Sequence, residues 1–583
     1  MIRHGDPRQA PLIDPWSHLG PKRRRLLEDS WAGLFRQELL VELPVAELAP
    51  GFCAGFGRPT KELRTVLGVL VLQQMHDLTD LETVDQLAFN EKWHFALDIP
   101  SESDAAKYMC PKTLWSMRQK VTDLGLDTVI FQRVADKLAR VFKVDTTKQR
   151  LDSVHLKSNM RKLGRLGILT RCVSSFLVNL KRRHPELYGG LEPELRERYG
   201  TKKALECFSQ VKPSAADQTL AEVARECFGL LKRFAGQPQV GEMRSYRLLA
   251  RAFHDQCEVK AGEAPVAISV RPSREVACTS LQNPSDPEAG YNSHKGQGYQ
   301  AQVMETYCTE EDPKVREQTL NLITHVATAP ASESDSRALL PALKDTQARG
   351  LGPGEIVADT PYGSDDNCRE AAALKVEVVS PPPGLPPSPK LSLTDFQVSP
   401  EGRVLACPRG EAPQSWRYRQ KKERYRVNFS PARCEACPEK TRCPVKPAKK
   451  YYYLSYYAKA GRVAARRAYQ QTGEFRERYR WRAGLEATMS EFDRRTGVKS
   501  LRVRGLKAVG YCVSLKASAL NILRAAAVRL AQRRAGEAAF GSSPGFSWLF
   551  SRVKEQFSAL GEAIIDFLLP DAYPGPGSLK LAA

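Results

Sequence analysis

The sequence has no long hydrophobic run. None of its apolar stretches reaches the ~18–20 residues that a membrane-spanning helix requires. The first residues, MIRHGDPRQAPLIDPW, also lack the apolar core of a secretion signal. These two absences argue against a membrane protein and against export, so we expect a cytoplasmic protein.

A regular cysteine pattern of the kind found in disulfide-rich domains is also lacking. The chain has 14 cysteines, most of them scattered singly, which is typical of small buried side chains and not of a disulfide framework. Four others gather in ACPRG…SPARCEACPEKTRCPVKP, at Cys407, Cys434, Cys437 and Cys443. Their C-x2-C spacing with further thiols nearby predicts a tetrahedral structural Zn²⁺ site. Because they do not form two clean C-x2-C knuckles, four reduced and unligated cysteines are the alternative.

Acidic residues are outnumbered by basic ones. The chain has 88 Lys and Arg against 66 Asp and Glu, and residues 401–480 alone hold 21 basic and 7 acidic side chains. Aromatic residues are interleaved with the charges, as in SWRYRQKKERYRVNFS and KKYYYLSYYAK. Cations neutralise phosphates and aromatic rings stack on bases. The segment therefore favours nucleic-acid binding, with a merely solvated basic surface as the alternative.

The order of sequence patterns predicts an α/β fold. A chain of 583 residues is too long for one core, so several domains are expected. Helical spacing covers residues 28–140 and returns near 160–260 and at 333–350. Strand patterns lie at 148–160, 264–270, 298–308, 319–330, 354–363 and 374–387. Strand patterns that are followed by helical patterns indicate an α/β fold. A helical insertion near 160–260 and the basic segment near 388–470 interrupt it.

The stretch RYRWRAGLEATMSEFDRR, residues 478–495, predicts one amphipathic α-helix. Tyr479, Arg482 and Glu486 follow the spacing of a single helix face, which presents a carboxylate beside a guanidinium. Apolar residues follow the same spacing on a neighbouring face: Trp481, Leu485, Met489 and Phe492.

Two aspartates belong to strand patterns. Asp152 lies inside the short strand pattern RLDSVHLKS, and Asp359 ends the apolar run EIVAD before the turn TPYGSDDN. In open α/β sheets, ligands gather at the carboxyl ends of strands, and a buried carboxylate is costly unless it faces a site or a partner. Taken singly, each aspartate is more simply explained as the cap of a turn or helix.

Five ordered motifs resemble a known family. They are LDSVHLKSNM…LGRLG, DPEAGYNSHKGQGYQAQVMET, ITHVATAPASESDS, IVADTPYGSDDN and YRWRAGLEATMSEFDRR. Together they are similar to DDE transposases of bacterial insertion sequences, in the branch with a Tyr-x-x-Arg-x-x-x-Glu signature. Here that signature falls on Tyr479, Arg482 and Glu486. The helical N-terminal segment GRPTKELRTVLGVLVLQQMHDLTDLETVDQLAFN resembles the N-terminal domain of the same branch.

The resemblance implies a ribonuclease-H-like catalytic domain with a helical N-terminal domain and two insertions, one helical and one basic with the cysteines. The ranges that it implies are a helical DNA-binding domain at 1–140, the first part of the catalytic domain at 145–387 with a helical insertion at about 160–260, a basic, Tyr-rich insertion at 388–470, the last part of the catalytic domain at 471–530 and a C-terminal tail at 531–583.

The resemblance also implies the catalytic acids Asp152, Asp359 and Glu486. These would hold two Mg²⁺ or Mn²⁺ ions, since hard cations take oxygen ligands and a pair of ions ~3.5–4 Å apart serves phosphodiester chemistry. Arg482 would orient a phosphate or Glu486, and Tyr479 would contact DNA near the cut. Where the family signature continues to a lysine, this chain has Asp493.

Arg494 and Arg495, which follow Asp493, either replace that lysine as DNA contacts or are ordinary solvated charges. The expected partners are double-stranded DNA, as element ends and target, and a second copy of the chain, because two ends must be brought together. Because DNA is the expected partner, we expect the protein to associate with the nucleoid in the cytoplasm. The alternatives are a catalytically inactive, transposase-derived DNA-binding protein and a zinc-stabilised RNA-binding protein.

Overall fold

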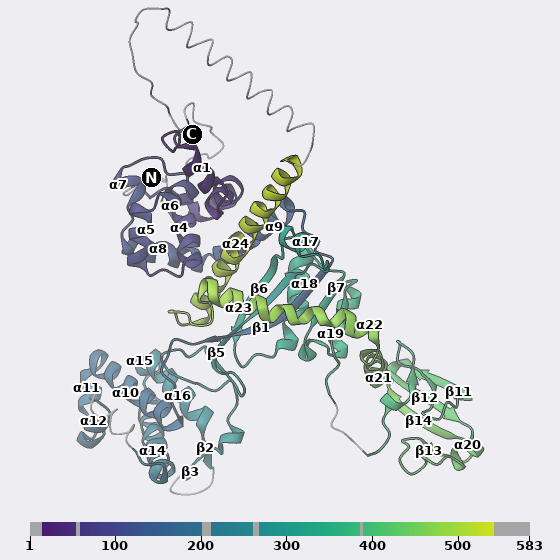
Figure 1. Ribbon diagram of the computed structural model, residues 1–583. Helices are drawn as coiled ribbons and strands as arrows, with labels where there is room; N and C mark the ends of the chain where they lie inside the picture. Colours follow the sequence, from purple (N-terminus) through teal and green to yellow (C-terminus); the bar gives the residue numbers. More distant parts are fainter. Residues whose placement is uncertain (1–13, 54–58, 201–210, 261–266, 385–388, 542–583) are drawn as a thin grey trace, which may run out of the picture.

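A computed structural model describes residues 14–53, 59–200, 211–260, 267–384 and 389–541 of the chain (Figure 1). The fold is mixed α/β, with helices around a curled mixed sheet. In these ranges, no helix combines the length and the apolar character needed to cross a membrane. Of the tail at 531–583, the first residues continue the last helix, and 542–583 lie outside the described residues.

The N-terminal part is helical, as its spacing predicts. Its α-helices are α1 (Pro21–Glu28), α2 (Trp31–Leu34), α3 (Val45–Leu48), α4 (Leu63–Met75), α5 (Asp80–Phe89), α6 (Glu91–Ala96), α7 (Asp104–Lys107), α8 (Pro111–Asp123) and α9 (Leu126–Val141). Thr79 begins α5 with a capping box, in which its side chain and that of Glu82 satisfy each other's backbone N–H groups.

A six-stranded sheet forms the centre of the molecule. Its strands are β1 (Lys148–Lys157), β4 (Gly290–Asn292), β5 (Gly296–Thr306), β6 (Ile323–Pro330), β7 (Glu355–Ala358) and β8 (Glu377–Val379). The order is β4-β5-β1-β7-β8, with β6 also paired to β5. β1 runs antiparallel to β5 and parallel to β7, which runs parallel to β8. The strand predictions at 148–160, 298–308, 319–330 and 354–363 are confirmed by these elements.

Three helices accompany the later strands: α17 (Pro313–Gln318), α18 (Leu339–Ala348) and α19 (Asp365–Ala373). α18 buries Leu339 and Leu343 in a small core with Leu151 and Ile356 of the sheet. This packing holds β1 and β7 together from one face, next to the two aspartates.

Residues 165–270 form a helical unit with its own core. It contains α10 (Arg165–Arg183), α11 (Pro185–Gly189), α12 (Pro193–Gly200), α14 (Ala216–Phe234), α15 (Pro238–Gly241), α16 (Arg244–Gln256) and the hairpin β2 (Cys257–Lys260) and β3 (Ala267–Val270). Phe176, Phe234 and Phe253 lie at its centre. In Figure 1 the unit lies below and to the left of the central sheet.

A second unit is built from short strands: β9 (Gln397–Val398), β10 (Val404–Ala406), β11 (Ser415–Arg419), β12 (Arg424–Phe429), β13 (Lys446–Pro447) and β14 (Tyr452–Tyr457), with α20 (Pro431–Glu435). The last four strands pair in the order β11-β12-β14-β13, here called the small sheet. α21 (Ala458–Gln470) follows β14 directly, and Figure 1 shows the small sheet projecting from the central sheet at the end of this helix.

The prediction of a single helix at 478–495 is wrong. The chain forms α22 (Gly473–Tyr479), a 3₁₀ turn η10 (Arg480–Ala483) and α23 (Gly484–Thr496). The break coincides with a contact from outside the segment, because Arg150 Nη1 on β1 donates a hydrogen bond of 2.8 Å to the Trp481 carbonyl. A Cβ on Gly484 would lie 2.0 Å from the same Arg150 nitrogen, so glycine gives the guanidinium its space.

The predicted apolar face is divided by this break. Leu485, Met489 and Phe492 are buried in the main core. Trp481 instead stacks on Tyr307, with ring centroids 5.9 Å apart, and packs against a separate cluster around Phe475. The spacing therefore assigned Trp481 to the wrong core.

The long helix α24 (Leu506–Gly541) joins the N-terminal helices to the sheet. It runs diagonally across the molecule in Figure 1, with α9 beside it and β6 below. Buried Asn521 hydrogen-bonds both the N–H and the carbonyl of Ile323 on β6, at 2.9 and 2.8 Å. A single apolar core includes side chains from the N-terminal helices, the sheet, α23 and α24.

Candidate functional site

Strand register brings Asp152 and Asp359 together. β1 and β7 pair in parallel, with Leu151 opposite Ala358. Each aspartate is the next residue after this pair: Asp359 follows the last residue of β7, and Asp152 lies beside it in the middle of β1, where the pairing with β7 ends. The placement matches the general position of ligand sites in α/β sheets.

Arg482 links the three candidate acids. Its Nη2 lies 3.1 Å from Asp152 Oδ2 and 3.3 Å from Asp359 Oδ2. Its Nη1 lies 3.8 Å from Glu486 Oε1, one turn further along the chain. Acids from β1, β7 and α23 therefore surround one guanidinium, although they are far apart in the sequence.

The three carboxylates differ in exposure. The side chain of Asp152 is 19% exposed, that of Asp359 40% and that of Glu486 78%. Burial raises the pKa of the Asp152 carboxyl, and the charge of Asp359 adds to this, while the Ser153 N–H and Arg482 oppose it. The site thus concentrates negative charge at its buried end and opens to solvent at Glu486.

Tyr479 completes the group. Its hydroxyl donates a long hydrogen bond of 3.4 Å to Asp359 Oδ1. Burial, and then the negative charge of Asp359, raise the pKa of Tyr479 to about 12. The phenol therefore stays neutral at physiological pH and remains a hydrogen-bond donor.

Both aspartates also satisfy nearby backbone groups. Asp359 Oδ1 accepts a 2.8 Å hydrogen bond from the N–H of Thr360 and caps the 3₁₀ turn Thr360–Tyr362. Asp152 Oδ1 accepts one of 2.7 Å from the N–H of Ser153. The capping interpretation is therefore correct for one oxygen of Asp359, whereas Asp152 lies inside β1 and caps no turn or helix. The second oxygen of each faces Arg482, which capping does not explain.

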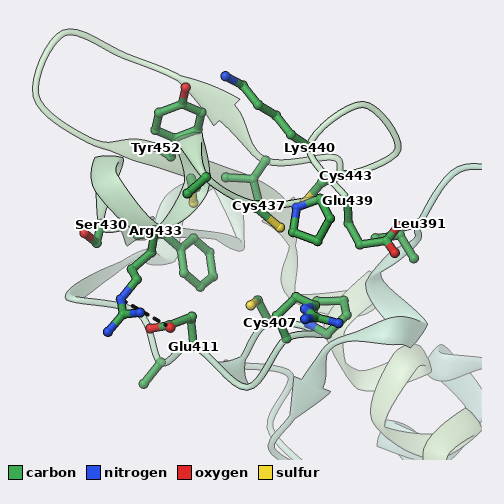
Figure 2. Close-up of a pocket in the computed structure, with 18 residues that line it drawn as sticks. Leu391, Cys407, Glu411, Ser430, Arg433, Cys437, Glu439, Lys440, Cys443 and Tyr452 are labelled. Carbon is green, nitrogen blue, oxygen red and sulfur yellow. Dashed lines mark ion pairs between the residues drawn. The ribbon is translucent and has the colours of Figure 1, made fainter.

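The four clustered cysteines line one cavity in the small-sheet unit (Figure 2). The cavity has a volume of about 270 Å³, and Cys407, Cys434, Cys437 and Cys443 reach it from loops and from α20. The pKa of the Cys434 thiol is raised to about 11, by burial first and then by the other three thiols. The fold thus gathers sulfurs from residues that are up to 36 positions apart in sequence.

Within the described residues, no group of three or more His, Cys, Asp or Glu side chains is arranged to hold a metal ion. At the three acids, the guanidinium of Arg482 supplies the positive charge between the carboxylates. The donor set is all carboxylate oxygen, which suits a hard ion such as Mg²⁺. Arg482 Nε is buried and has no hydrogen-bond partner, so the guanidinium is incompletely satisfied there. The chemistry of these oxygens suits a divalent ion, although the described side chains are not arranged around a site for one.

Residues 406–526 match the family model described as a transposase DDE domain. This match supports a DDE transposase, and the mixed fold is consistent with the ribonuclease-H-like domain of such enzymes. The matched range contains Arg482, Glu486 and the four cysteines, and it begins after the two aspartates. No curated protein matches the chain.

The two arginines predicted beyond Glu486 lie near the end of α23. Arg495 Nε is 2.9 Å from Glu491, an ordinary pair one turn apart on the helix surface. Arg494 is exposed. Asp493 lies in the last turn of α23, which ends at Gly497 in a left-handed conformation, and its side chain accepts a 3.0 Å hydrogen bond from the N–H of Lys499 beyond the helix. Asp493, which stands in place of the family's lysine, therefore has a structural role.

A buried carboxylate that the sequence analysis missed fixes the position of α23. Glu305 on β5 is fully buried and lies 2.7 Å from Arg150 Nη2 on β1 and 2.9 Å from Arg524 Nη1 on α24. It also accepts a 2.7 Å hydrogen bond from Thr488 on α23. The two arginines and this hydrogen bond outweigh burial and lower the pKa of Glu305. The sequence signal for this buried carboxylate was the single acid, Glu305, in the strand pattern QAQVMETYC.

Proposed function

We propose that the protein is a transposase that cleaves DNA at the ends of an insertion sequence and joins the freed ends to target DNA. What supports the proposal is the convergence of Asp152, Asp359 and Glu486 on Arg482, together with the family match over 406–526. Double-stranded DNA is the substrate, and two ends held together require a second copy of the chain. The protein acts in the cytoplasm, on nucleoid DNA.

In this proposal the three carboxylates hold two Mg²⁺ or Mn²⁺ ions. When bound, such a pair activates an attacking oxygen and neutralises a leaving oxygen. Arg482 then moves away from the carboxylates, and its guanidinium binds a phosphate of the DNA. Tyr479, neutral because of its raised pKa, donates a hydrogen bond to the DNA backbone beside Asp359.

The reaction has two parts. Cleavage at an element end releases a 3′-hydroxyl, and this hydroxyl then attacks a phosphodiester of the target in a second displacement. The helices before residue 140 and the basic insertion at 388–470 hold the element ends. Arg494 lies exposed beyond the acids, where it can contact the flanking duplex.

The direct test is incubation with a DNA fragment that carries the flanking ends of the gene, with and without Mg²⁺. Ends cut only in the presence of the metal, and later joined to a second duplex, support the proposal. A protein that binds the fragment but leaves it intact with either Mg²⁺ or Mn²⁺ is instead an inactive descendant that binds DNA.

Metal binding should be visible in thermal stability. We expect Mg²⁺ or Mn²⁺ to raise the Tm, because an ion that binds only the folded chain stabilises it by about 2.7 kcal/mol at a hundred times its Kd. The Asp359→Asn variant should lose the increase, as measured by differential scanning calorimetry. The matched control is Asp366→Asn, whose carboxylate pairs with Lys459 at 2.7 Å on the surface. An equal shift in both variants would place the ion elsewhere.

We propose in addition that the four cysteines hold a structural Zn²⁺. The purified protein should contain one zinc per chain by inductively coupled plasma mass spectrometry. Cys434→Ser with Cys437→Ser should abolish the zinc and lower the Tm, because small units with little apolar core depend on such metals. Cys278→Ser, at an exposed single cysteine, is the control and should change neither. A well-folded protein with far less than one zinc rejects the site.

A further inference from the structure

Four arginines face one another across two strands of the small sheet. β11 and β12 pair antiparallel, with Arg417 opposite Arg426 and Arg419 opposite Arg424. Directly opposite residues of an antiparallel pair point to the same face, so the four guanidinium groups share one surface. We call this surface, made of Arg417, Arg419, Arg424 and Arg426, the arginine face.

The opposite face of the small sheet is the one that builds its core. Val427, Phe429, Tyr452, Leu454 and Tyr456 are buried there. Side chains alternate along a strand, so the arginines between these residues point away from the core. Arg417, Arg419 and Arg424 are exposed, and Arg426 is half-buried. The arginine face is therefore an outer surface.

Nothing in the described part of the chain neutralises the arginine face with an ion pair. The acid of the connecting turn, Glu423, lies 3.9 Å from Arg369 on α19 instead. Like charges directly opposite each other destabilise a sheet. The repulsion between the arginines therefore lowers the stability of the sheet, and no ion pair offsets it. Such a surface is suited to an anionic partner.

Tyrosine rings hold two of the guanidinium groups in place. Arg426 lies over Tyr453, 4.1 Å from the ring centroid, and Arg424 lies over Tyr457 at 4.9 Å. Arg426 Nη2 also donates a 3.3 Å hydrogen bond to the Tyr451 hydroxyl. Rings order the side chains and leave N–H groups able to donate to a ligand, which is the preorganised form in which guanidinium binds phosphate.

The small sheet is tied to the loop that follows Asp359. β14 runs directly into α21, whose Arg462 Nη2 lies 2.7 Å from Asp365. Arg466, one turn later, donates hydrogen bonds to the carbonyls of Gly363 and Ser380, at 2.7 and 3.0 Å. These hydrogen bonds fix the arginine face relative to the candidate acids.

We infer that the arginine face is a clamp for the phosphate backbone of duplex DNA, distinct from the acidic site and rigidly connected to it. The inference rests on the proposed function for its choice of DNA as partner. Guanidinium pairs without base-reading side chains between them bind phosphates independently of sequence. The clamp therefore holds DNA beside the cut and supplies affinity without specificity.

The test is the salt dependence of duplex binding by the full-length chain, measured by fluorescence anisotropy. Replacing all four residues of the arginine face with Gln should weaken binding at least tenfold at ~0.1 M salt. It should also flatten the plot of log K against log salt concentration by about 0.9 for each phosphate that the variant no longer neutralises, so by up to about 3.6. Replacing all four with Lys should retain most of the slope, because the charge remains.

A matched control removes the same charge elsewhere. Four exposed basic residues of α10 are replaced with Gln: Arg171, Lys181, Arg182 and Arg183. This variant should bind with the wild-type slope. An unchanged slope in the arginine-face variant, or an equal loss of affinity in the control, overturns the inference. So does an arginine-face variant that loses binding to RNA of the same length and retains binding to duplex DNA.

The inference and the proposed function can fail separately. Wild-type protein that never cuts DNA with Mg²⁺, while the arginine-face variant loses its salt slope, rejects the transposase and keeps the clamp. Protein that cuts DNA, with an arginine-face variant that binds and cuts like the wild type, rejects the clamp alone. The Tm of the variant should be at least that of the wild type, since a repulsion has been removed.

Discussion

Replacing Asp152 with Asn is expected to lower the rate of DNA cleavage by at least about three orders of magnitude while leaving DNA binding intact. The reduction corresponds to about 4 kcal/mol of transition-state stabilisation, which is the order of effect of a divalent ion on a phosphoryl centre. Asp359→Asn and Glu486→Gln should behave alike, because each acid contributes to one site around Arg482. Single-turnover cleavage of a labelled element end measures the rate.

The amide substitutions preserve shape. In Asp152→Asn and Asp359→Asn, the side-chain amide keeps an oxygen that can accept from the N–H of the next residue, so the local turns survive. Asp366→Asn on α19 is the matched control, since its carboxylate pairs with Lys459 on the surface, away from the acids. Cleavage by the three acid variants within a few-fold of the wild-type rate would remove the acids from the reaction.

Glu305→Gln is expected to destabilise the fold by about 3–5 kcal/mol, because it leaves buried Arg150 without a counter-charge. The Gln oxygen can still accept from Thr488, so the loss falls on the pairs with Arg150 and Arg524. Chemical denaturation followed by circular dichroism gives the free energy of unfolding. The control is Glu333→Gln, whose exposed pair with Arg337 should contribute no more than about 1 kcal/mol.

The same carboxyl predicts a pH dependence. The pKa of Glu305 is lowered below its ordinary value of 4.5 in the folded chain, so the folded state binds its proton less readily than the unfolded state. Its contribution to stability is therefore complete above pH ~4.5 and is lost as the pH falls through the folded pKa. In Glu305→Gln this part of the acid sensitivity should disappear. Should the variant fail to fold, Thr488→Val should still cost about 1–2 kcal/mol, and wild-type stability in either variant contradicts the role of Glu305.

Most strands of the central sheet and both aspartates of the site could be predicted from the sequence. Strand patterns predicted β1, β5, β6 and β7, and acids inside or at the end of such patterns marked Asp152 and Asp359. Which strands become neighbours is a property of the whole sheet, and local pattern does not contain it. The parallel pairing of β1 with β7 is what places the two aspartates side by side.

The helix of Glu486 shows where local pattern fails. Spacing alone predicted one helix. Arg150, more than 300 residues earlier in the sequence, donates a hydrogen bond to the Trp481 carbonyl, and the helix is interrupted there. The guanidinium of Arg150 is itself oriented by Glu305. A hydrogen bond between residues so distant in the sequence overrides helical periodicity, and no window of neighbouring residues records it.

The basic segment was recognisable from composition, whereas its geometry was not. Residues 401–480 gave the charge and the aromatic content. Whether arginines gather on one face depends on the register of β11 and β12, since a shift by one residue would alternate them with tyrosines. The cysteines are similar, because spacing suggested a cluster and only the fold shows that all four line one cavity.

The most direct test of the account is a crystal structure with Mn²⁺, located by its anomalous scattering. The account predicts manganese between the carboxylates of Asp152, Asp359 and Glu486, with the guanidinium of Arg482 moved away from the two aspartates. Manganese bound elsewhere, with Arg482 still bridging the carboxylates in protein that cuts DNA in the same solution, would contradict it.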